Sequence, residues 1–231
     1  MAPRGFVMAI DGPSGAGKTA AGMLVAERIG AVFVDTGIFY RALTLLALRE
    51  GAPIEDSAAL TALVSAVVSA VVEPPSGCRL VEAHIRGEPA GDAIRSPEVE
   101  ARVSEVAGHP GVRAAILGLQ REAAHGEPAI VAGRDIGTVV FPEASLKVYL
   151  DASADERARR RARQLGFPAV EKRVAASLAA RDAGDVGRPV APLARATDAV
   201  VVDTDGLSLA EVVEELDALV RRSLAGSDAR P

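Results

Sequence analysis

The chain alternates short, continuously apolar runs with longer stretches in which apolar residues recur at helical spacing. The apolar runs cover residues 6–10, 31–34, 129–132, 146–150 and 199–202, and each leads into a polar or glycine-containing turn. Such runs are typical of strands that are buried on both faces of a parallel sheet. The alternation therefore predicts an α/β fold in which helices flank a five-stranded parallel sheet. Sites in such folds lie at the carboxyl ends of the strands.

Two regions are too long to be ordinary connections between strands. The first spans residues 51–128, whereas such connections usually take roughly two to six residues. Its expected elements are a helix over 56–72, a strand over 79–85 that pairs with a strand after Gly87-Glu88, and helical residues 96–124 broken at His109-Pro110-Gly111. We interpret this region as an inserted subdomain that covers a substrate.

The second long region spans residues 152–195 and is rich in arginine. Its arginines stand at positions 157, 159, 160, 161, 163, 173, 181, 188 and 195, with Gly184 and Gly187 near its end. Two arginine-bearing helices joined by a glycine-containing turn are typical of a mobile lid, although part of this charge would also suit a solvated helix face. The core domain is expected to comprise residues 1–50, 129–151 and 196–224, with a closing amphipathic helix over 207–219 and a flexible tail over 225–231.

Composition and charge exclude several classes of protein. The 231 residues are 49% hydrophobic and 25% charged, which is ordinary for a globular protein. The formal net charge of −5 argues against a nucleic-acid-coating surface, which would be basic. Cys78 is the single cysteine, so no disulfide can form within the chain, and the three histidines do not stand at metal-ligand spacing. The apolar stretch over 58–72 is short for a membrane span, and we expect a cytoplasmic protein.

One glycine-rich segment carries the most specific chemistry. It reads Gly12-Pro13-Ser14-Gly15-Ala16-Gly17-Lys18-Thr19 and fits the P-loop pattern G-x-x-x-x-G-K-[ST]. It follows the first apolar run and opens a helical stretch over 19–29, which is the context that the motif requires. In such a loop the backbone N–H groups surround a phosphate, Lys18 reaches the β- and γ-phosphates of ATP, and the Thr19 hydroxyl can bind Mg²⁺. The segment predicts nucleotide binding but leaves the reaction open.

Small phosphotransferases are the P-loop class that best suits the rest of the chain. Switch GTPases read guanine through an asparagine-lysine motif, and the chain contains no asparagine. A transferase whose acceptor is itself a phosphate needs several converging arginines, because a guanidinium binds phosphate oxygens in a bidentate way. Arg41, Arg134, Arg181 and Arg188 stand where such a cluster would form, since the first two follow predicted strands and the others lie in the lid.

Four segments of the chain together carry a family resemblance. They are the P-loop, the turn Asp35-Thr36-Gly37-Ile38-Phe39-Tyr40-Arg41, the run Gly133-Arg134-Asp135-Ile136-Gly137-Thr138-Val139-Val140-Phe141-Pro142, and the lid segment Arg181-Asp182-Ala183-Gly184-Asp185-Val186-Gly187-Arg188. In this order they resemble the bacterial cytidylate kinases, from the first strand to about Leu219. The resemblance implies a P-loop nucleoside monophosphate kinase fold with an acceptor-binding insert and a lid. It also implies transfer of the γ-phosphoryl group of ATP to CMP or dCMP with Mg²⁺.

The resemblance assigns roles residue by residue. Arg41, Arg134 and Arg188 would clamp the acceptor's phosphate; Thr36, Ser104, Arg113 and Asp135 would read cytosine; Arg181 and Asp185 would contact the ribose; Arg157 would stack on the adenine of ATP and Arg161 would approach its phosphates. Lys18, Arg181 and Arg188 are the expected catalytic residues. The chain departs from the family at Thr36, where serine is usual, and at Gly184 and Val186, where some relatives carry arginine.

The chemistry of Asp135 supports a preference for cytosine. A carboxylate there would accept a hydrogen bond from the exocyclic amine of cytosine and would face the carbonyl of uracil with like polarity. Asp135 also follows a predicted strand, where a P-loop enzyme can hold the water shell of Mg²⁺. Asp35 is the competing candidate for that metal role, acting through water.

Two other functions remain open on the sequence. One is a different small-molecule kinase, for example one with a hydroxyl acceptor of the shikimate type, although the long insert and Gly133-Arg134-Asp135 argue against it. The other is a non-catalytic nucleotide-binding regulator, which would be expected to lack some of the four arginines. We expect ATP and CMP or dCMP as partners, no nucleic acid or membrane, and a monomer, because a closing insert and lid need free edges.

Overall fold

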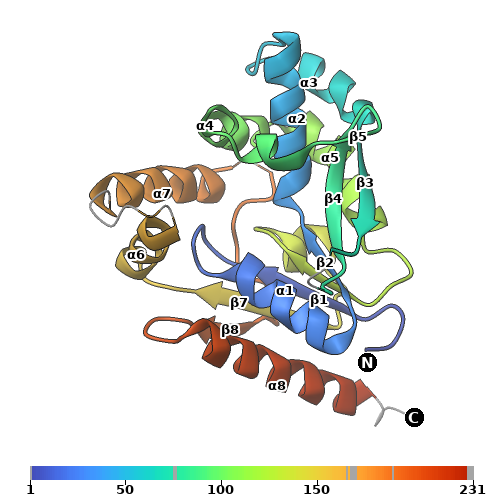
Figure 1. Cartoon of the computed structure of the whole chain (residues 1–231), viewed down its shortest axis with the longest axis vertical. Coiled ribbons are helices and arrows are strands. Elements are labelled where there is room, and N and C mark those ends of the chain that lie inside the picture. The colour runs from blue at the N-terminus through green and yellow to red at the C-terminus, as the bar shows by residue number, and fades with distance from the viewer. Residues whose placement is uncertain (1, 75–76, 165, 167–170, 189, 228–231) are drawn as a thin grey trace.

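A central β-sheet with helices on both of its faces organises the chain (Figure 1). The computed structural model describes residues 2–74, 77–164, 166, 171–188 and 190–227. The five predicted strands are β1 (Val7–Asp11), β2 (Val32–Asp35), β6 (Ala129–Ala132), β7 (Leu146–Asp151) and β8 (Val200–Asp203). Each lies within one residue of its predicted bounds.

These five strands pair in parallel in the order β2-β6-β1-β7-β8. Strand β1 lies in the middle, where Ile10 stands opposite Ala132 of β6 and Val148 of β7. Because parallel strands end at the same edge, the loops that follow β1 and β6 meet there. The expected α/β fold is confirmed, and the five predicted strands pair in parallel within a larger, eight-stranded sheet.

Alternate residues of β1 point to opposite faces of the sheet. Met8 and Ile10 pack into a hydrophobic cluster with helices α1 (Lys18–Ile29) and α8 (Leu209–Ser227). Ala9 belongs to a second cluster, which includes helix α2 (Gly37–Glu50) and much of the insert. Strand β1 is therefore held by apolar contacts on both faces, and this fixes the loop that follows it.

The insert after α2 contributes helices and additional strands. Its elements are α3 (Ser57–Leu63), η1 (Val64–Ala66), β3 (Val67–Val72), β4 (Leu80–Ile85), β5 (Glu88–Pro89), η2 (Gly91–Arg95), α4 (Pro97–Val106) and α5 (Pro110–Glu122). Strand β4 lies beside β2, where Leu80 stands opposite Phe33, and it pairs antiparallel with β3 and β5. The insert thus extends the sheet to eight strands and packs its helices beside α2.

The helix expected over residues 56–72 is wrong in its second half. Helix α3 ends at Leu63, and residues 67–72 form β3, which pairs along its whole length with β4. Four of the six residues of β3 are valine, whose branched Cβ suits a pleated surface better than a helix. The strand expected after Gly87 is the two-residue β5, and β3 is the main partner of β4.

Two helices, α6 (Ala154–Gln164) and α7 (Glu171–Val186), form the region that was predicted to be a lid. They pack against each other, and α7 also contacts α4 of the insert (Figure 1). The turn expected between them lies largely outside the described residues. Helix α8 is longer than the expected 207–219, and 228–231 of the predicted tail are likewise not described. Within the described part of the chain, no helix has the length and apolar character needed to cross a bilayer.

Candidate active site

The P-loop connects the carboxyl end of β1 to the first turn of α1. Gly12, Gly15 and Gly17 have positive φ angles of 145°, 82° and 93°. At Gly12 an added Cβ would lie only 2.0 Å from the backbone oxygen of Leu150 in β7, so no other residue fits against that strand. A loop of this kind in front of a helix N-terminus presents backbone N–H groups to an anion.

Lys18, the first residue of α1, is folded back onto the loop that carries it. Its Nζ donates hydrogen bonds to the carbonyl oxygens of Gly12 and Pro13, at 2.6 Å each. Burial, followed by the positive charge of Arg134, lowers the pKa of Lys18 well below its ordinary value, and three nearby carboxylates act in the opposite direction. The Lys18 side chain is therefore buried beside the loop.

Asp11, the last residue of β1, ties the P-loop to the loop that follows β6. Its Oδ1 accepts from the backbone N–H of Ile136 at 2.7 Å, and its Oδ2 accepts from that of Gly137 at 2.8 Å. Burial raises the pKa of Asp11 to about 6, while these two hydrogen bonds act to lower it. No sequence pattern indicated this contact, because its partners are backbone groups 125 and 126 residues away.

The lid reaches the P-loop through Arg157 of α6 and Asp182 of α7. The backbone N–H of Ser14 donates to Asp182 Oδ1 at 3.1 Å, and Arg157 donates to the carbonyl oxygen of Ser14 at 3.0 Å. Arg157 and Asp182 also form an ion pair with each other. The structure therefore places Arg157 at the P-loop, together with a carboxylate that sequence analysis did not single out.

Asp185 of α7 joins two of the arginines that were predicted to bind the acceptor's phosphate. Its carboxylate accepts from Arg134 Nε at 2.7 Å and forms an ion pair with Arg188. Arg134 also donates to the hydroxyl of Ser14 at 2.6 Å, so this group touches the P-loop. Burial lowers the pKa of Arg188, and Asp185 acts to raise it. Among the described residues, Nε of Arg188 is a buried donor with no hydrogen-bond partner.

Glu100 of α4 joins the other two arginines of the predicted cluster. Its two carboxylate oxygens accept from Arg41 Nε and Arg181 Nη1, each at 2.9 Å. Burial acts to raise the pKa of Glu100, but the two guanidinium groups outweigh it and hold the pKa below its ordinary value. One insert carboxylate thus connects α2 to the lid, and this residue was missed because its partners come from other elements.

Arg113 of α5 and Asp135 form a buried ion pair in the predicted base-reading group. Each side chain is 6% exposed. The guanidinium of Arg113 lies over the ring of Tyr40, 5.4 Å from its centroid, which is cation–π geometry. Asp135 therefore faces a cation of the insert.

Thr36 and Ser104, the other two residues expected to read the base, come from the end of β2 and from α4, respectively. The Thr36 hydroxyl is buried and donates to the backbone oxygen of Ala132 at 2.9 Å. An added Cβ at Gly133 would lie 2.6 Å from that hydroxyl, so the two loops pack tightly. Ser104 is half-buried on α4, the helix that carries Glu100.

The two candidates for metal binding lie at the ends of neighbouring elements. The Thr19 side chain is exposed in the first turn of α1. Asp35 is half-buried at the end of β2, where its Oδ1 accepts from the backbone N–H of Gly37 at 3.0 Å. Its negative charge acts to raise the pKa of Lys18.

Arg161 is not brought to the P-loop. It donates to Gln164 of its own helix at 3.1 Å, and its charge acts on Glu100 of the insert. Arg160 also lies near the loop, because its Nη1 is 3.9 Å from a Cβ built at Gly17. The same guanidinium donates to the hydroxyl of Thr204 at 2.9 Å. The prediction for Arg161 thus has no support in this geometry, and Arg160 is the residue that was missed.

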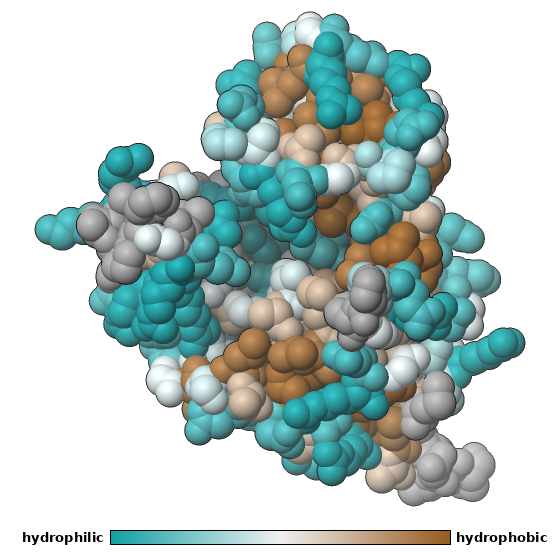
Figure 2. Space-filling model, in the orientation of Figure 1, coloured by the Kyte–Doolittle hydropathy of each residue, from teal (hydrophilic) through white to brown (hydrophobic). Residues whose placement is uncertain are grey.

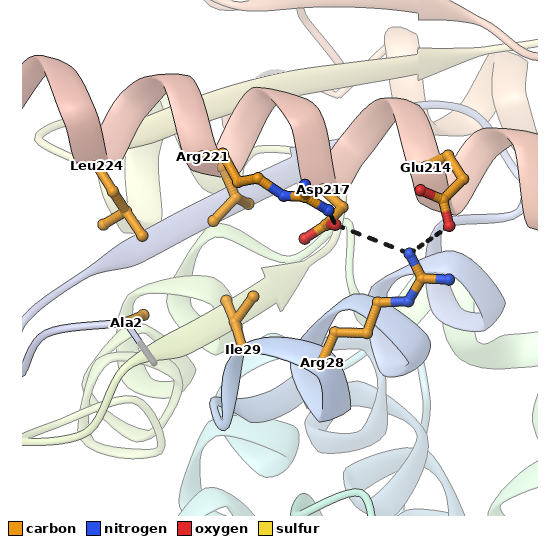
Figure 3. A pocket seen from close by; sticks show the side chains of 8 residues that line it. Ala2, Arg28, Ile29, Glu214, Asp217, Arg221 and Leu224 are labelled. Atoms are coloured by element: carbon orange, nitrogen blue, oxygen red, sulfur yellow. Dashed lines mark hydrogen bonds and ion pairs between the residues drawn. The ribbon is translucent and has the colours of Figure 1, made fainter.

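The surface is hollowed and hydrophilic between the lid helices and the insert (Figure 2). A second hollow lies between α1 and α8, where Arg28 pairs with Glu214 at 2.7 Å and with Asp217 at 3.8 Å (Figure 3). None of the predicted site residues lines that second hollow. The site residues instead gather where the P-loop, the loop after β6, the insert and the lid meet.

The fold and this arrangement of residues define a P-loop phosphotransferase. The model of the cytidylate kinase family matches residues 8–222. The chain is 42% identical to the cytidylate kinase of Geobacter sulfurreducens over 94% of each chain, and 41% identical to that of Solibacter usitatus over 93% of this chain and 92% of the relative. It is also 42% identical to a bifunctional pantoate ligase/cytidylate kinase of Synechococcus sp. (strain JA-3-3Ab), in which 96% of this chain matches 42% of the longer protein. The chain belongs to the cytidylate kinase family.

Proposed function

We propose a division of labour among the site residues of this (d)CMP kinase, which transfers the γ-phosphoryl group of ATP to CMP or dCMP. Residues 12–19 bind the phosphates of ATP, with Lys18 on the β- and γ-phosphates. Arg41, Arg134 and Arg188 bind the acceptor's phosphate; Thr36, Ser104, Arg113 and Asp135 read the base; and Arg181 and Asp185 bind the ribose. Arg181 and Arg188 also neutralise the transferring group.

The observation that carries this proposal is the convergence of four arginines beside the P-loop. Arg41 and Arg181 meet at one carboxylate, and Arg134 and Arg188 meet at another. The arginines come from α2, the loop after β6, and α7 with the residues that follow it. Each of these two pairs of guanidinium groups surrounds a single anionic group, which is the arrangement that phosphate groups require.

Mg²⁺ fits this site as the metal of ATP. The Thr19 hydroxyl would bind it directly, and Asp35, half-buried at the end of β2, would hold one of its waters. The ion supplies neutralisation of charge on the β- and γ-phosphates. The donor set is oxygen only, as Mg²⁺ prefers.

The protein's own residues position and neutralise rather than transfer protons. The acceptor's phosphate oxygen is already an anion, so no general base is needed for an in-line attack. Closing the lid onto the insert brings its arginines to the phosphates and excludes water, which would otherwise accept the phosphoryl group. We propose residues 51–128 as the acceptor-binding insert and 152–195 as the lid.

The direct test is release of ADP from ATP·Mg²⁺ with CMP, dCMP, UMP, AMP and shikimate offered separately. Strong turnover with CMP and dCMP, and little with UMP, is the expected result. If only another acceptor were phosphorylated, the protein would still be a kinase, but the proposed recognition of cytosine would be wrong. Binding of ATP without turnover on any acceptor would indicate a nucleotide-binding regulator.

The cellular role that suits this reaction is the supply of pyrimidine nucleoside diphosphates in the cytoplasm. We propose that the protein acts as a monomer on small molecules alone, without nucleic acid or membrane. The formal net charge of −5 supports this, because a nucleic-acid-binding surface would be basic.

Replacing Asp135 by asparagine is expected to lower the selectivity for CMP over UMP by about 10- to 100-fold, since a buried polar group without its partner costs about 1–3 kcal/mol. The amide can turn a donor toward the uracil oxygen, which the carboxylate cannot. The ratio of kcat/KM for CMP and UMP measures the change. Asp198→Asn is the matched control, because Asp198 is exposed and paired only with Lys147 at the surface. An unchanged ratio in Asp135→Asn would contradict base reading by this residue.

Replacing Glu100 by glutamine is expected to lower the KM for CMP by about 3- to 10-fold, because charge-assisted hydrogen bonds are roughly twice as strong as neutral ones. The carboxylate competes with the acceptor's phosphate for Arg41, and an amide competes less. Steady-state kinetics with varied CMP measure the shift. Glu105→Gln on the same helix is the control, since Glu105 is exposed and pairs with Arg102. A higher KM would mean that Glu100 orients Arg41 rather than competing for it.

A further inference from the structure

Asp11 is a buried carboxylate to which the proposed phosphoryl transfer assigns no role. It is 4% exposed, and both of its oxygens accept backbone hydrogen bonds from the loop after β6. Burying a carboxylate is costly unless its hydrogen bonds repay the cost. These two bonds, of 2.7 and 2.8 Å, are therefore a strong local constraint.

The position of Asp11 in the chain determines which two loops these hydrogen bonds connect. Asp11 directly precedes Gly12, the first residue of the P-loop. Its two partners, Ile136 and Gly137, directly follow Arg134 and Asp135. One side chain thus spans the loop that binds the donor and the loop that carries two acceptor ligands.

The loop after β6 depends on this carboxylate for its shape. Residues Ile136–Val140 form a π-helical turn, and the first N–H groups of such a turn have no partner within it. Asp11 satisfies two of them. An added Cβ at Gly137 would lie 3.3 Å from Asp11 Oδ2 and 3.1 Å from Cδ of Lys147, so the loop is packed closely against the carboxylate.

We propose that Asp11 is a positioning residue that sets the place of Arg134 and Asp135 relative to the P-loop. This inference rests on the proposed function of those two residues as acceptor ligands. Asp11 does not touch either substrate. It acts through the backbone of residues 136 and 137, and it determines how well the acceptor is bound and how strictly cytosine is selected.

The first test compares Asp11→Asn and Asp11→Ala with the wild-type protein. In the asparagine variant one N–H keeps an acceptor, while the amide NH₂ faces the other N–H. We expect KM for CMP to rise by about 10- to 100-fold, because a small misplacement of substrate-binding groups costs that much. KM for ATP should stay within about threefold of the wild-type value, and the ratio of kcat/KM for CMP to that for UMP should fall. A residue with a purely structural role would not be expected to change that ratio.

Asp217→Asn is the matched control. Asp217 is also a buried aspartate, 6% exposed, but it pairs with Arg28 and Arg221 in the hollow between α1 and α8 (Figure 3). We expect this variant to lower the melting temperature and to leave both KM values unchanged. A rise in KM for CMP in Asp217→Asn as large as in Asp11→Asn would overturn the proposal, because it would reflect lost stability alone.

Gly137→Ala tests the same contact from the other side and keeps Asp11 intact. The added methyl group pushes the loop away from the carboxylate, so we expect the same rise in KM for CMP. KM for CMP within twofold of wild type in folded Asp11→Asn and Gly137→Ala overturns the inference. Wild-type turnover of CMP is measured first, because its absence would overturn the proposed function instead.

Discussion

Replacing Lys18 by alanine is expected to lower kcat by about a thousandfold or more, since removing one preorganised charge or donor from a phosphoryl- or acyl-transfer site typically costs 10²–10⁵. The fold should persist. Lys18 is buried at the start of α1 and donates only to carbonyl oxygens of its own loop. Of the three lysines in the chain, it alone lies in the P-loop motif. Its loss therefore leaves the β- and γ-phosphates without the ammonium group that the motif provides.

Steady-state release of ADP from ATP and CMP measures the effect of Lys18→Ala. Lys172→Ala is the matched control, because Lys172 is an exposed residue in the first turn of α7. Thermal unfolding confirms that both variants fold. Turnover close to that of the wild type in a folded Lys18→Ala protein would contradict the assignment of the P-loop to catalysis.

The strands and the two loops of the site could be predicted because their signals are local. Each core strand is a continuous apolar run, and a run buried on both faces has that pattern whatever its partner. The P-loop and the run from Gly133 to Pro142 are contiguous motifs whose spacing is set by backbone geometry. The parallel order of the strands then brings these loops to one edge of the sheet.

The error at β3 has a physical cause. Four of the six residues 67–72 are the β-branched valine, but in isolation the segment extends the pattern of the helix before it. They form a strand because β4 offers a complete ladder of partners, from Val67 opposite Ile85 to Val72 opposite Leu80. That partner lies across a connection whose length and shape no local pattern fixes.

The choice of arginine on α6 shows a second limit. Arg157 and Arg161 are spaced i, i+4 and share one side of the helix. One face of a helix can nevertheless contact more than one neighbouring part of the protein. Arg157 donates to Ser14 of the P-loop and Arg160 lies near Gly17, whereas Arg161 donates to Gln164 of its own helix. In a segment so crowded with arginine, a rotation of one residue decides the contact, and only tertiary packing sets that rotation.

Three carboxylates of the site could not be predicted either. Glu100 and Asp182 lie on helices and pair with arginines from other elements, and Asp11 ends β1 and accepts from backbone N–H groups of a distant loop. An acidic residue on a helix surface usually faces solvent, and nothing in the sequence marks Glu100 or Asp182 as different. The arginines Arg41, Arg181 and Arg157 are therefore already paired with carboxylates of the same chain.

Replacing Arg188 by alanine is expected to lower kcat/KM for CMP by about 10³-fold or more, within the range for arginines that stabilise a transferring phosphoryl group. Arg188 is 8% exposed and pairs with Asp185, and its Nε is a buried donor without a partner among the described residues. Removing Arg188 does not leave the Asp185 carboxylate unpaired, because Arg134 still donates to it at 2.7 Å. The loss should therefore appear in kinetics more than in stability.

Arg188→Lys separates the charge of Arg188 from its geometry. Lysine keeps the positive charge but cannot bind two phosphate oxygens through a planar fork, so we expect it to restore only part of the lost kcat/KM. Arg195→Ala is the control, because Arg195 is exposed in the same region of the chain and is assigned no role. Full activity in Arg188→Lys would mean that charge alone suffices at this position. A folded Arg188→Ala protein with wild-type kinetics would remove Arg188 from the acceptor clamp and leave Arg41 and Arg134 as its members.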